Sequence, residues 1–138
     1  MNTENKELLL KDLCARLPYG VIVQIPELFY TTKTIDVKLD AIFKVNDDFH
    51  FTDDYGYLLE NIKPYLRPMY SMTEEEKKEF NSLMYGVEER CINAYGKGGY
   101  TLAFTEVNDW LNAHHFDYRG LIKKGLAIKV TPENNPYK

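Results

Sequence analysis

The chain has 138 residues, which is the length of one compact domain and too short for two domains of ordinary size. Apolar residues make up 44% of it and charged residues 28%, which excludes wholesale disorder because enough hydrophobic surface is available for a core. The formal net charge of -4 excludes broad attraction to nucleic acid or to anionic membranes, so only a local basic patch would bind either.

The N-terminus and the cysteines indicate a cytoplasmic protein. Residues 1–6 (MNTENK) lack the basic and apolar regions of a signal peptide, and no stretch approaches the ~18 apolar residues of a membrane span. Cys14 and Cys91 are too few for a disulfide framework, and both fall at apolar positions of predicted helices. We therefore expect two buried thiols and no membrane association.

The N-terminal half changes from helical to strand periodicity. Residues 5–17 place apolar side chains at helical spacing, and a proline follows them. Alternation with a period of two predicts strands over residues 19–25 and 35–45, each with one buried face. Residues 46–48 have turn composition and residues 49–51 resume the alternation, so an antiparallel hairpin is expected there.

The middle of the chain is predicted to pass from an extended connector into a long helix. Two prolines favour extended backbone over residues 63–68. Thr73 and Glu76 have the spacing of a capping box, which begins a helix whose apolar stripe continues to Ala94. A glycine-rich stretch, residues 96–99, then ends the helix.

The C-terminal part is predicted to hold a strand, two helices and a last strand. Residues 100–104 have strand composition, and Thr105 can cap the first helix. Asp117 can cap a second, short helix over residues 118–124, with a final strand over residues 126–130. The inner stripe of the first helix comprises Val107, Trp110, Leu111 and His114.

Together these elements predict a single α+β domain over residues 1–138. It has an N-terminal helix, a small antiparallel sheet and C-terminal helices packed on that sheet. Residues 131–138 contain two prolines and are expected to form a loose tail.

His114, His115 and Asp117 are the densest group of side chains suited to acid–base or metal chemistry. Adjacent helical residues point about 100° apart, and no second ligand pair has a matching spacing, so we expect no metal and no cofactor. The simpler interpretation is that His114 packs beside Trp110, His115 is solvated and Asp117 caps a helix.

Two further clusters have simple explanations in turn chemistry. Five residues form an acidic group without the pattern of a calcium loop: Asp47, Asp48, His50, Asp53 and Asp54. The stretch GKGG at residues 96–99 lacks the spacing of a phosphate-binding loop.

Residues 105–124 resemble in outline a helix-turn-helix followed by a strand. Four basic residues accompany this segment: Arg119, Lys123, Lys124 and Lys129. The second helix is only about two turns long and the chain as a whole is acidic, which disfavours nucleic acid as the partner. A solvated basic face is the alternative explanation.

The chain is rich in tyrosine, with 11 tyrosines beside 7 phenylalanines. Tyrosine is favoured at protein interfaces, so part of this content indicates a binding surface, although a tyrosine-rich margin of the core explains it equally well. The candidates for exposure are Tyr65, Tyr70, Tyr85 and Tyr95.

Four strings occur in order along nearly the whole chain: KDLCARLPYGV from Lys11, IKPYLRPM from Ile62, SMTEEE from Ser71 and DWLNAHHFDYRGLI from Asp109. In these strings the chain resembles a family of small uncharacterised proteins from anaerobic gut bacteria and their phages or prophages. The resemblance implies a prophage or mobile-element setting. It implies no activity, substrate or catalytic residue, because none is assigned to that family.

The sequence therefore favours a non-enzymatic protein-binding or adaptor module with a protein partner. A small nucleic-acid-binding protein is the alternative, and a metal-dependent hydrolase using His114, His115 and Asp117 is a third hypothesis. No catalytic residue is predicted. The candidate binding residues are Tyr65, Arg67, His115, Asp117, Arg119 and Lys123.

Overall fold

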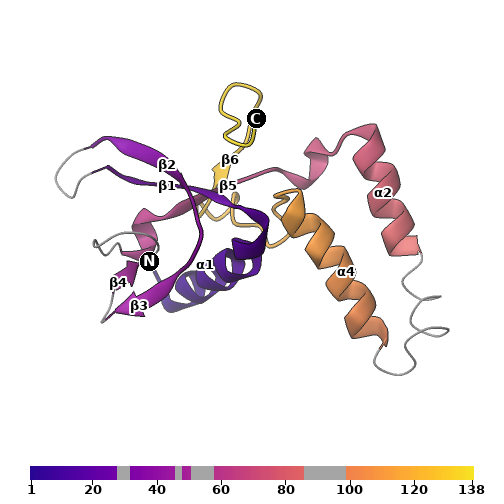
Figure 1. The fold of residues 1–138 in the computed structure, drawn as a ribbon, viewed down its shortest axis with the longest axis horizontal. Coiled ribbons are helices and arrows are strands. Elements are labelled where there is room, and N and C mark those ends of the chain that lie inside the picture. Colours follow the sequence, from indigo (N-terminus) through magenta and orange to yellow (C-terminus); the bar gives the residue numbers. More distant parts are fainter. Residues whose placement is uncertain (28–31, 46–47, 51–57, 86–98) are drawn as a thin grey trace.

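The computed structural model describes residues 1–27, 32–45, 48–50, 58–85 and 99–138 (Figure 1). The α+β prediction is confirmed: an N-terminal helix and C-terminal helices accompany a four-stranded, mostly antiparallel sheet. The helices are α1 (Thr3–Arg16), α2 (Glu74–Tyr85) and α4 (Gly99–Ala113). The strands are β1 (Ile22–Pro26), β2 (Thr34–Lys38), β3 (Phe43–Val45), β4 (Asp48–His50), β5 (Lys63–Leu66) and β6 (Ile128–Lys129).

Helix α1 forms where the helical spacing predicts it and supplies the main core. The side chain of Asn2 caps it by accepting a hydrogen bond from the backbone N–H of Asn5 at 2.7 Å. Leu9 and Leu13 are fully buried against the sheet, and burial of each stabilises the fold by roughly 2 kcal/mol. Cys14 is on the outer side of the helix and exposed, so the predicted burial of this thiol is wrong. Cys91 lies outside the described residues.

The four-stranded sheet has the order β2-β1-β5-β6, with β5 and β6 parallel and the other pairs antiparallel. The inner strand β5 occupies residues predicted to be a connector. Pro64 within it and Pro68 just after it favour extended backbone, which suits a strand as well as a connector, and Tyr65 and Leu66 are buried there. The sequence thus predicted the backbone shape of this segment correctly but missed its place in the sheet.

The long strand predicted over residues 35–45 is divided into β2 and β3. Strand β2 pairs with β1 up to Lys38, which lies opposite Ile22. One further bond follows, from the N–H of Leu39 to the carbonyl of Val21 at 2.9 Å, and the 3-10 helix η1 (Leu17–Tyr19) lies just before that residue. Strands β3 and β4 then form a separate antiparallel pair, which confirms the predicted hairpin.

Helix α2 begins at the predicted capping box. The hydroxyl of Thr73 accepts a bond from the N–H of Glu76 at 3.1 Å, and a carboxylate oxygen of Glu76 accepts from the N–H of Thr73 at 2.9 Å. The helix is described to Tyr85, and its predicted continuation toward Ala94 lies outside the described residues.

The strand predicted over residues 100–104 is wrong, because α4 already begins at Gly99. A short apolar run fits a strand or a helix equally well, and here it belongs to the helix. Residues 118–124 form turns instead of the predicted helix. Gly120 has φ 76°, in the left-handed region, and so interrupts any regular helix there.

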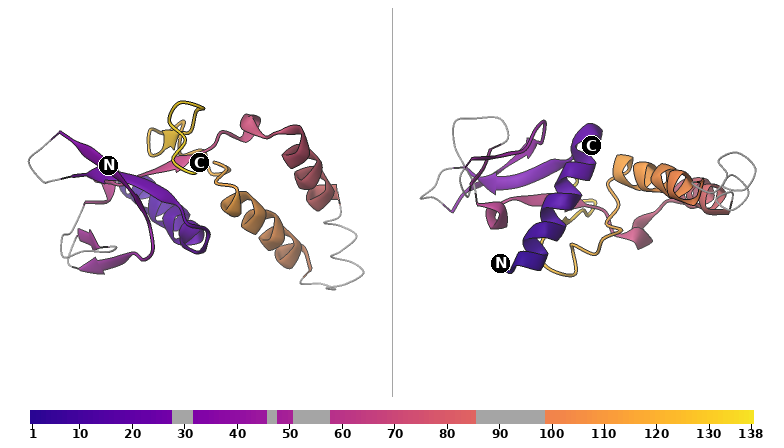
Figure 2. Two further views of the ribbon diagram at one scale, coloured as in Figure 1. Left: turned by 45° about the horizontal axis from the view of Figure 1, so that its top comes forward. Right: turned by 90° about the horizontal axis from the view of Figure 1, so that it is seen from below.

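Helices α2 and α4 lie side by side and form a two-helix arm beside α1 and the sheet (Figure 2). We call α2 and α4 the helical arm. Among the side chains that the structure describes, a separate, small cluster of three buried residues forms its core: Val107, Leu111 and Phe116. Five partly buried side chains surround this cluster: Met72, Phe80, Leu83, Trp110 and Tyr118. Helix α2 contributes no buried residue, and its Phe80 and Leu83 are only partly buried.

The C-terminal segment, predicted to be loose, is anchored by Tyr137. Its hydroxyl donates to the carbonyl of Tyr65 at 2.7 Å and accepts from the N–H of Ile22 at 3.1 Å. Because these groups belong to β5 and β1, one side chain ties the segment to both inner strands.

Candidate functional site

The candidate site is a groove on the helical arm, where α2 and α4 leave apolar side chains partly open. Its volume is about 540 Å³. The described lining residues are Lys78, Glu79, Ser82, Leu83 and Trp110. We call this the arm groove. Four of the five come from one face of α2, because residues three or four positions apart lie one above another on a helix.

Trp110 forms the α4 wall of the arm groove and is the only tryptophan in the chain. Its ring packs between Phe80, at a centroid distance of 5.8 Å, and His114, at 4.3 Å. Its indole N–H donates to a carboxylate oxygen of Glu79 at 3.0 Å. The indole is therefore held in one orientation, with a carboxylate fixed beside it.

Arg67 fixes the base of the arm relative to the sheet. Its two terminal nitrogens each donate to one carboxylate oxygen of Glu76 at 2.7 Å, and its guanidinium carbon lies 4.2 Å from the centroid of the Phe116 ring. The hydrogen bonds from Arg67 lower the pKa of Glu76 from 4.5 to about 2. The Arg67 backbone also pairs with both neighbours of Phe116: its N–H donates to the His115 carbonyl, and its carbonyl accepts from the Asp117 N–H, each at 2.8 Å.

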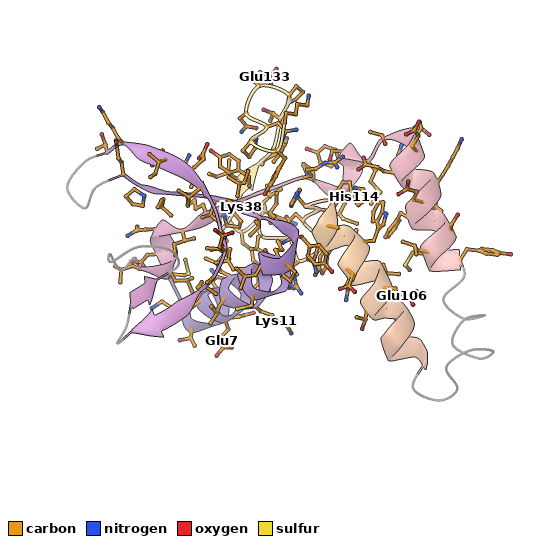
Figure 3. The ribbon with its side chains drawn as sticks, in the orientation of Figure 1. Glu7, Lys11, Lys38, Glu106, His114 and Glu133 are labelled. Carbon is orange, nitrogen blue, oxygen red and sulfur yellow. The ribbon has the colours of Figure 1, made fainter. Side chains whose placement is uncertain are left out.

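The two histidines occupy different environments at the end of α4. Nδ1 of His114 lies 3.2 Å from the Glu76 carboxylate, and Figure 3 shows His114 on the side of α4 that faces α2. The ring of His115 stacks on Tyr137 with a centroid distance of 3.7 Å. Burial lowers the pKa of His115 from 6.5 to about 4, so this ring is neutral at pH 7. Both histidines border a second pocket of about 390 Å³ that also includes Arg67 and Tyr137.

His115 has φ 64°, in the left-handed region, where glycine is the usual residue. Its N–H bonds the carbonyl of Asn112, and the N–H of Phe116 bonds the carbonyl of Leu111. This pair of bonds is the Schellman ending of a helix. The backbone turn is what presents the His115 ring to Tyr137.

The sequence-predicted binding residues do not form one site. Tyr65 is buried, and its hydroxyl donates to Asp36 at 2.8 Å. Arg67 and His115 both border the second pocket at the base of the arm. Asp117 accepts hydrogen bonds from two backbone N–H groups with its two carboxylate oxygens, so it is a capping residue. Lys123 is exposed, away from the arm groove.

Arg119 has a structural position, because it donates to the buried carboxylate of Asp12 at 2.9 Å. The same carboxylate pairs with Arg16 at 2.8 Å, and neither side chain of this second pair is exposed. Arg16 also donates to the Phe116 carbonyl at 2.7 Å. These contacts join α1 to the turns after α4, and they remove Arg119 from the basic surface that a helix-turn-helix would need.

Two sequence hypotheses, a metal site and a helix-turn-helix, each required a particular arrangement that the described residues do not show. Among the residues that the structure describes, no three His, Cys, Asp or Glu side chains gather as a metal site. The second helix of the helix-turn-helix forms turns instead. Most of the acidic cluster around Asp53 and most of the GKGG stretch lie outside the described residues.

Glu76, Glu79 and Ser82 were not predicted as site residues, although the sequence held part of the signal. Glu79 and Ser82 lie with Glu75 and Lys78 on the polar side of the predicted helix, next to the apolar stripe that contains Leu83. What could not be predicted is the approach of Trp110 to Glu79, because the two residues are separated by 31 positions.

No protein-family model, curated protein or solved structure matches this chain. None of the described helices combines the length and the apolar character that a membrane span requires.

Proposed function

We propose that this chain is a non-enzymatic module that binds a partner protein through the arm groove. The observation that carries the proposal is the groove itself, where Leu83 and Trp110 are only partly covered in an arm with a small core. Partly exposed apolar side chains next to fixed polar groups are typical of binding surfaces.

The distribution of exposed aromatic and methionine side chains supports the same proposal. Tyr85, at the end of α2, is 90% exposed, and Tyr70, in the 3-10 helix η3 (Met69–Ser71), is 76% exposed. Met84 and Phe104 are also exposed on the two helices of the arm. Tyrosine, methionine and phenylalanine are enriched at protein interfaces, whereas Tyr65, another sequence candidate, is buried.

The setting that we propose is the cytoplasm of a cell that carries the gene on a prophage or other mobile element. The resemblance of four sequence strings to a family of phage and gut-bacterial proteins supports this setting. A protein adaptor of this kind requires no cofactor.

The experiment is affinity capture with the tagged full chain from a lysate of the source cells, with and without nuclease. Two variants accompany it: Ser82→Arg places a large charged side chain in the groove, and Glu7→Arg makes a similar change on exposed α1. We expect one stoichiometric protein partner that survives nuclease, is retained by Glu7→Arg and is lost with Ser82→Arg.

Two results would overturn the proposal. One is equal capture by the wild type and Ser82→Arg, which would place the binding surface elsewhere. The other is recovery of nucleic acid alone, released by raised salt, which would favour the nucleic-acid hypothesis. Far-UV circular dichroism of both variants establishes that a lost partner does not reflect a lost fold.

A further inference from the structure

We infer that two copies of this chain associate through the outer edge of β2, so that their two sheets join into one continuous sheet. The two β2 strands lie antiparallel about a two-fold axis at Val37. This surface is separate from the arm groove, because β2 and the helical arm lie at opposite sides of the molecule (Figure 1). The inference therefore does not rest on the proposed function.

The inner edge of β2 is identified by the hydrogen bonds just beyond its two ends. The N–H of Leu39 donates to the carbonyl of Val21, and the carbonyl of Lys33 accepts from the N–H of Glu27, both at 2.9 Å. Successive residues of an antiparallel strand direct their backbone N–H and C=O groups to alternate sides. The odd-numbered residues from 33 to 39 therefore direct these groups toward β1.

The even-numbered residues of β2 direct their backbone groups to the outer edge. These residues are Thr34, Asp36 and Lys38. No described strand lies on that side of β2, and the described part of the chain supplies these backbone groups with no hydrogen-bond partner. A row of open donors and acceptors of this kind is a template to which a further strand adds.

The backbone pattern limits how a second copy of β2 can add. Outward-facing groups bond only to outward-facing groups, so each even-numbered residue lies opposite an even-numbered residue of the other copy. The two-fold axis then passes through a residue, and the central choices are Ile35, Asp36 and Val37. An axis at Ile35 pairs Asp36 with Thr34 and forms no ion pair. An axis at Asp36 sets two carboxylates directly opposite each other, which is unfavourable.

An axis at Val37 gives complementary charges. Asp36 of each copy lies opposite Lys38 of the other, so an ion pair and a hydrogen-bonded backbone pair form on each side of the axis. Both side chains are exposed, and no oppositely charged group is bound to either among the described residues. Asp36 accepts a bond from the hydroxyl of Tyr65 through one oxygen, which leaves the other open. Because a two-fold contact repeats each pair, the strand supplies its own complement.

The apolar face of the sheet continues across the same axis. Val37 packs against the main core, and Ile35 shares its face but is 40% exposed. In this register the two Val37 side chains lie opposite each other, and Ile35 lies opposite Leu39 of the other copy. An exposed apolar side chain on an open edge thus gains an apolar neighbour.

The contact consists of one added strand pair, which is small beside the roughly 1,200 Å² of a stable interface. We therefore expect a reversible dimer with a Kd between about 10 μM and 1 mM.

The test is sedimentation equilibrium of the full chain at low salt and at concentrations up to about 1 mM. Lys38→Asp sets like charges opposite each other on both sides of the axis. It should weaken the dimer about thirtyfold, because each pair changes from attraction to repulsion. Lys11→Asp makes the same charge reversal on exposed α1 and should leave the dimer unchanged.

A charge exchange tests the register. The double variant Asp36→Lys, Lys38→Asp restores opposite charges in both pairs, so its dimer should be within about threefold of the wild type in Kd. An axis at Asp36 predicts neither the loss nor the recovery. Far-UV circular dichroism checks the fold of each variant, because Asp36 also bonds Tyr65.

Hydrogen exchange of the wild type tests the same contact without any substitution. Exchange at the outward N–H groups of Asp36 and Lys38 should become slower as the protein concentration rises. Exchange at the N–H of Val37, which faces β1, should not depend on concentration. If the double variant does not fold, this measurement decides.

Three results would overturn the inference. One is a chain that stays monomeric at about 1 mM. Another is a dimer that Lys38→Asp and Lys11→Asp affect equally, and the third is a folded double variant that does not recover the dimer. None of these results alters what the Ser82→Arg capture experiment shows, so the two proposals fail separately.

Discussion

Replacement of Glu76 by glutamine tests how firmly the helical arm is fixed to the sheet. The folded protein holds the pKa of Glu76 at about 2, against an ordinary value of 4.5, chiefly through its hydrogen bonds with Arg67. That difference corresponds to roughly 3 kcal/mol of stability at pH 7. Both side chains of the pair are largely buried, with 14% of Glu76 and 21% of Arg67 exposed, so most of this energy is retained. Since glutamine keeps part of the hydrogen bonding, we expect Glu76→Gln to cost about 2 kcal/mol.

The sign of the pH dependence follows from the lowered pKa. Because the folded pKa lies below the unfolded one, the contribution of Glu76 is present above about pH 4.5 and is lost as the pH falls toward 2. The difference in stability between wild type and Glu76→Gln should therefore be largest near pH 7 and close to zero at pH 2.

The assay is urea unfolding at a series of pH values. Trp110 emission reports the arm, and far-UV circular dichroism reports the whole chain. Glu74→Gln is the matched control, because Glu74 lies on the same helix and pairs with Lys77 but is 85% exposed; its replacement should have almost no effect. A difference in stability between wild type and Glu76→Gln that stays constant from pH 7 to pH 2 would contradict a stabilising bond between Arg67 and ionised Glu76, as would a cost no larger than that of Glu74→Gln.

Three further predictions concern the groups that join the C-terminal segment to the rest of the fold. Asp12→Asn should destabilise the protein by about 3–5 kcal/mol in chemical unfolding, because Arg16 and Arg119 lose their common buried carboxylate; a change below 1 kcal/mol would contradict the structure. Tyr137→Phe should lower the free energy of unfolding by about 1–3 kcal/mol, because it leaves the N–H of Ile22 and the carbonyl of Tyr65 without their partner. Native-state hydrogen exchange should become faster at the N–H of Ile22, and unchanged exchange would count against this bond. The lowered pKa of His115 means that the stability of the protein declines as the pH falls from about 6.5 to about 4, because the unfolded chain binds the proton more readily. Replacement by asparagine, which tolerates the left-handed backbone, should remove most of that decline. A decline of the same size in His115→Asn would assign it to another group.

The sequence predicted the elements whose signals are local. The helical stripe of α1 and the capping box of Thr73 and Glu76 depend on spacings of three or four residues, and both are present. The turn residues before β4 likewise predicted the antiparallel pair of β3 and β4. Each of these features is specified by residues within one or two turns of it.

Elements that depend on distant partners were not predicted. The proline-containing segment became the inner strand β5 because β1 and β6 lie on either side of it, and their paired residues are 39 or more positions away in the chain. The capping role of Glu76 was evident, but its bond to Arg67 depends on how η3 turns the chain between them. Arg119 was read as part of a basic surface because its buried partner, Asp12, is 107 positions away.

Only part of the arm groove could be predicted from the sequence. An excess of tyrosine indicated a binding surface, and the exposure of Tyr70 and Tyr85 agrees with that expectation. The groove requires the pairing of α2 with α4, and no local pattern encodes which face of α2 meets Trp110. The sequence suggested acid–base or metal chemistry for the two histidines. In the structure the ring of His115 is stacked on Tyr137, and His114 lies against Glu76.

The most direct test of a binding site in the arm groove is site-specific photo-cross-linking of the full chain in its source cells. A photoreactive phenylalanine analogue replaces Ser82, which lines the arm groove, and in a control replaces Glu7 on exposed α1. We expect one protein cross-linked from position 82 and none from position 7. A cross-link of equal yield from both positions, or none from position 82 while the chain still captures its partner, would contradict a binding site in the arm groove.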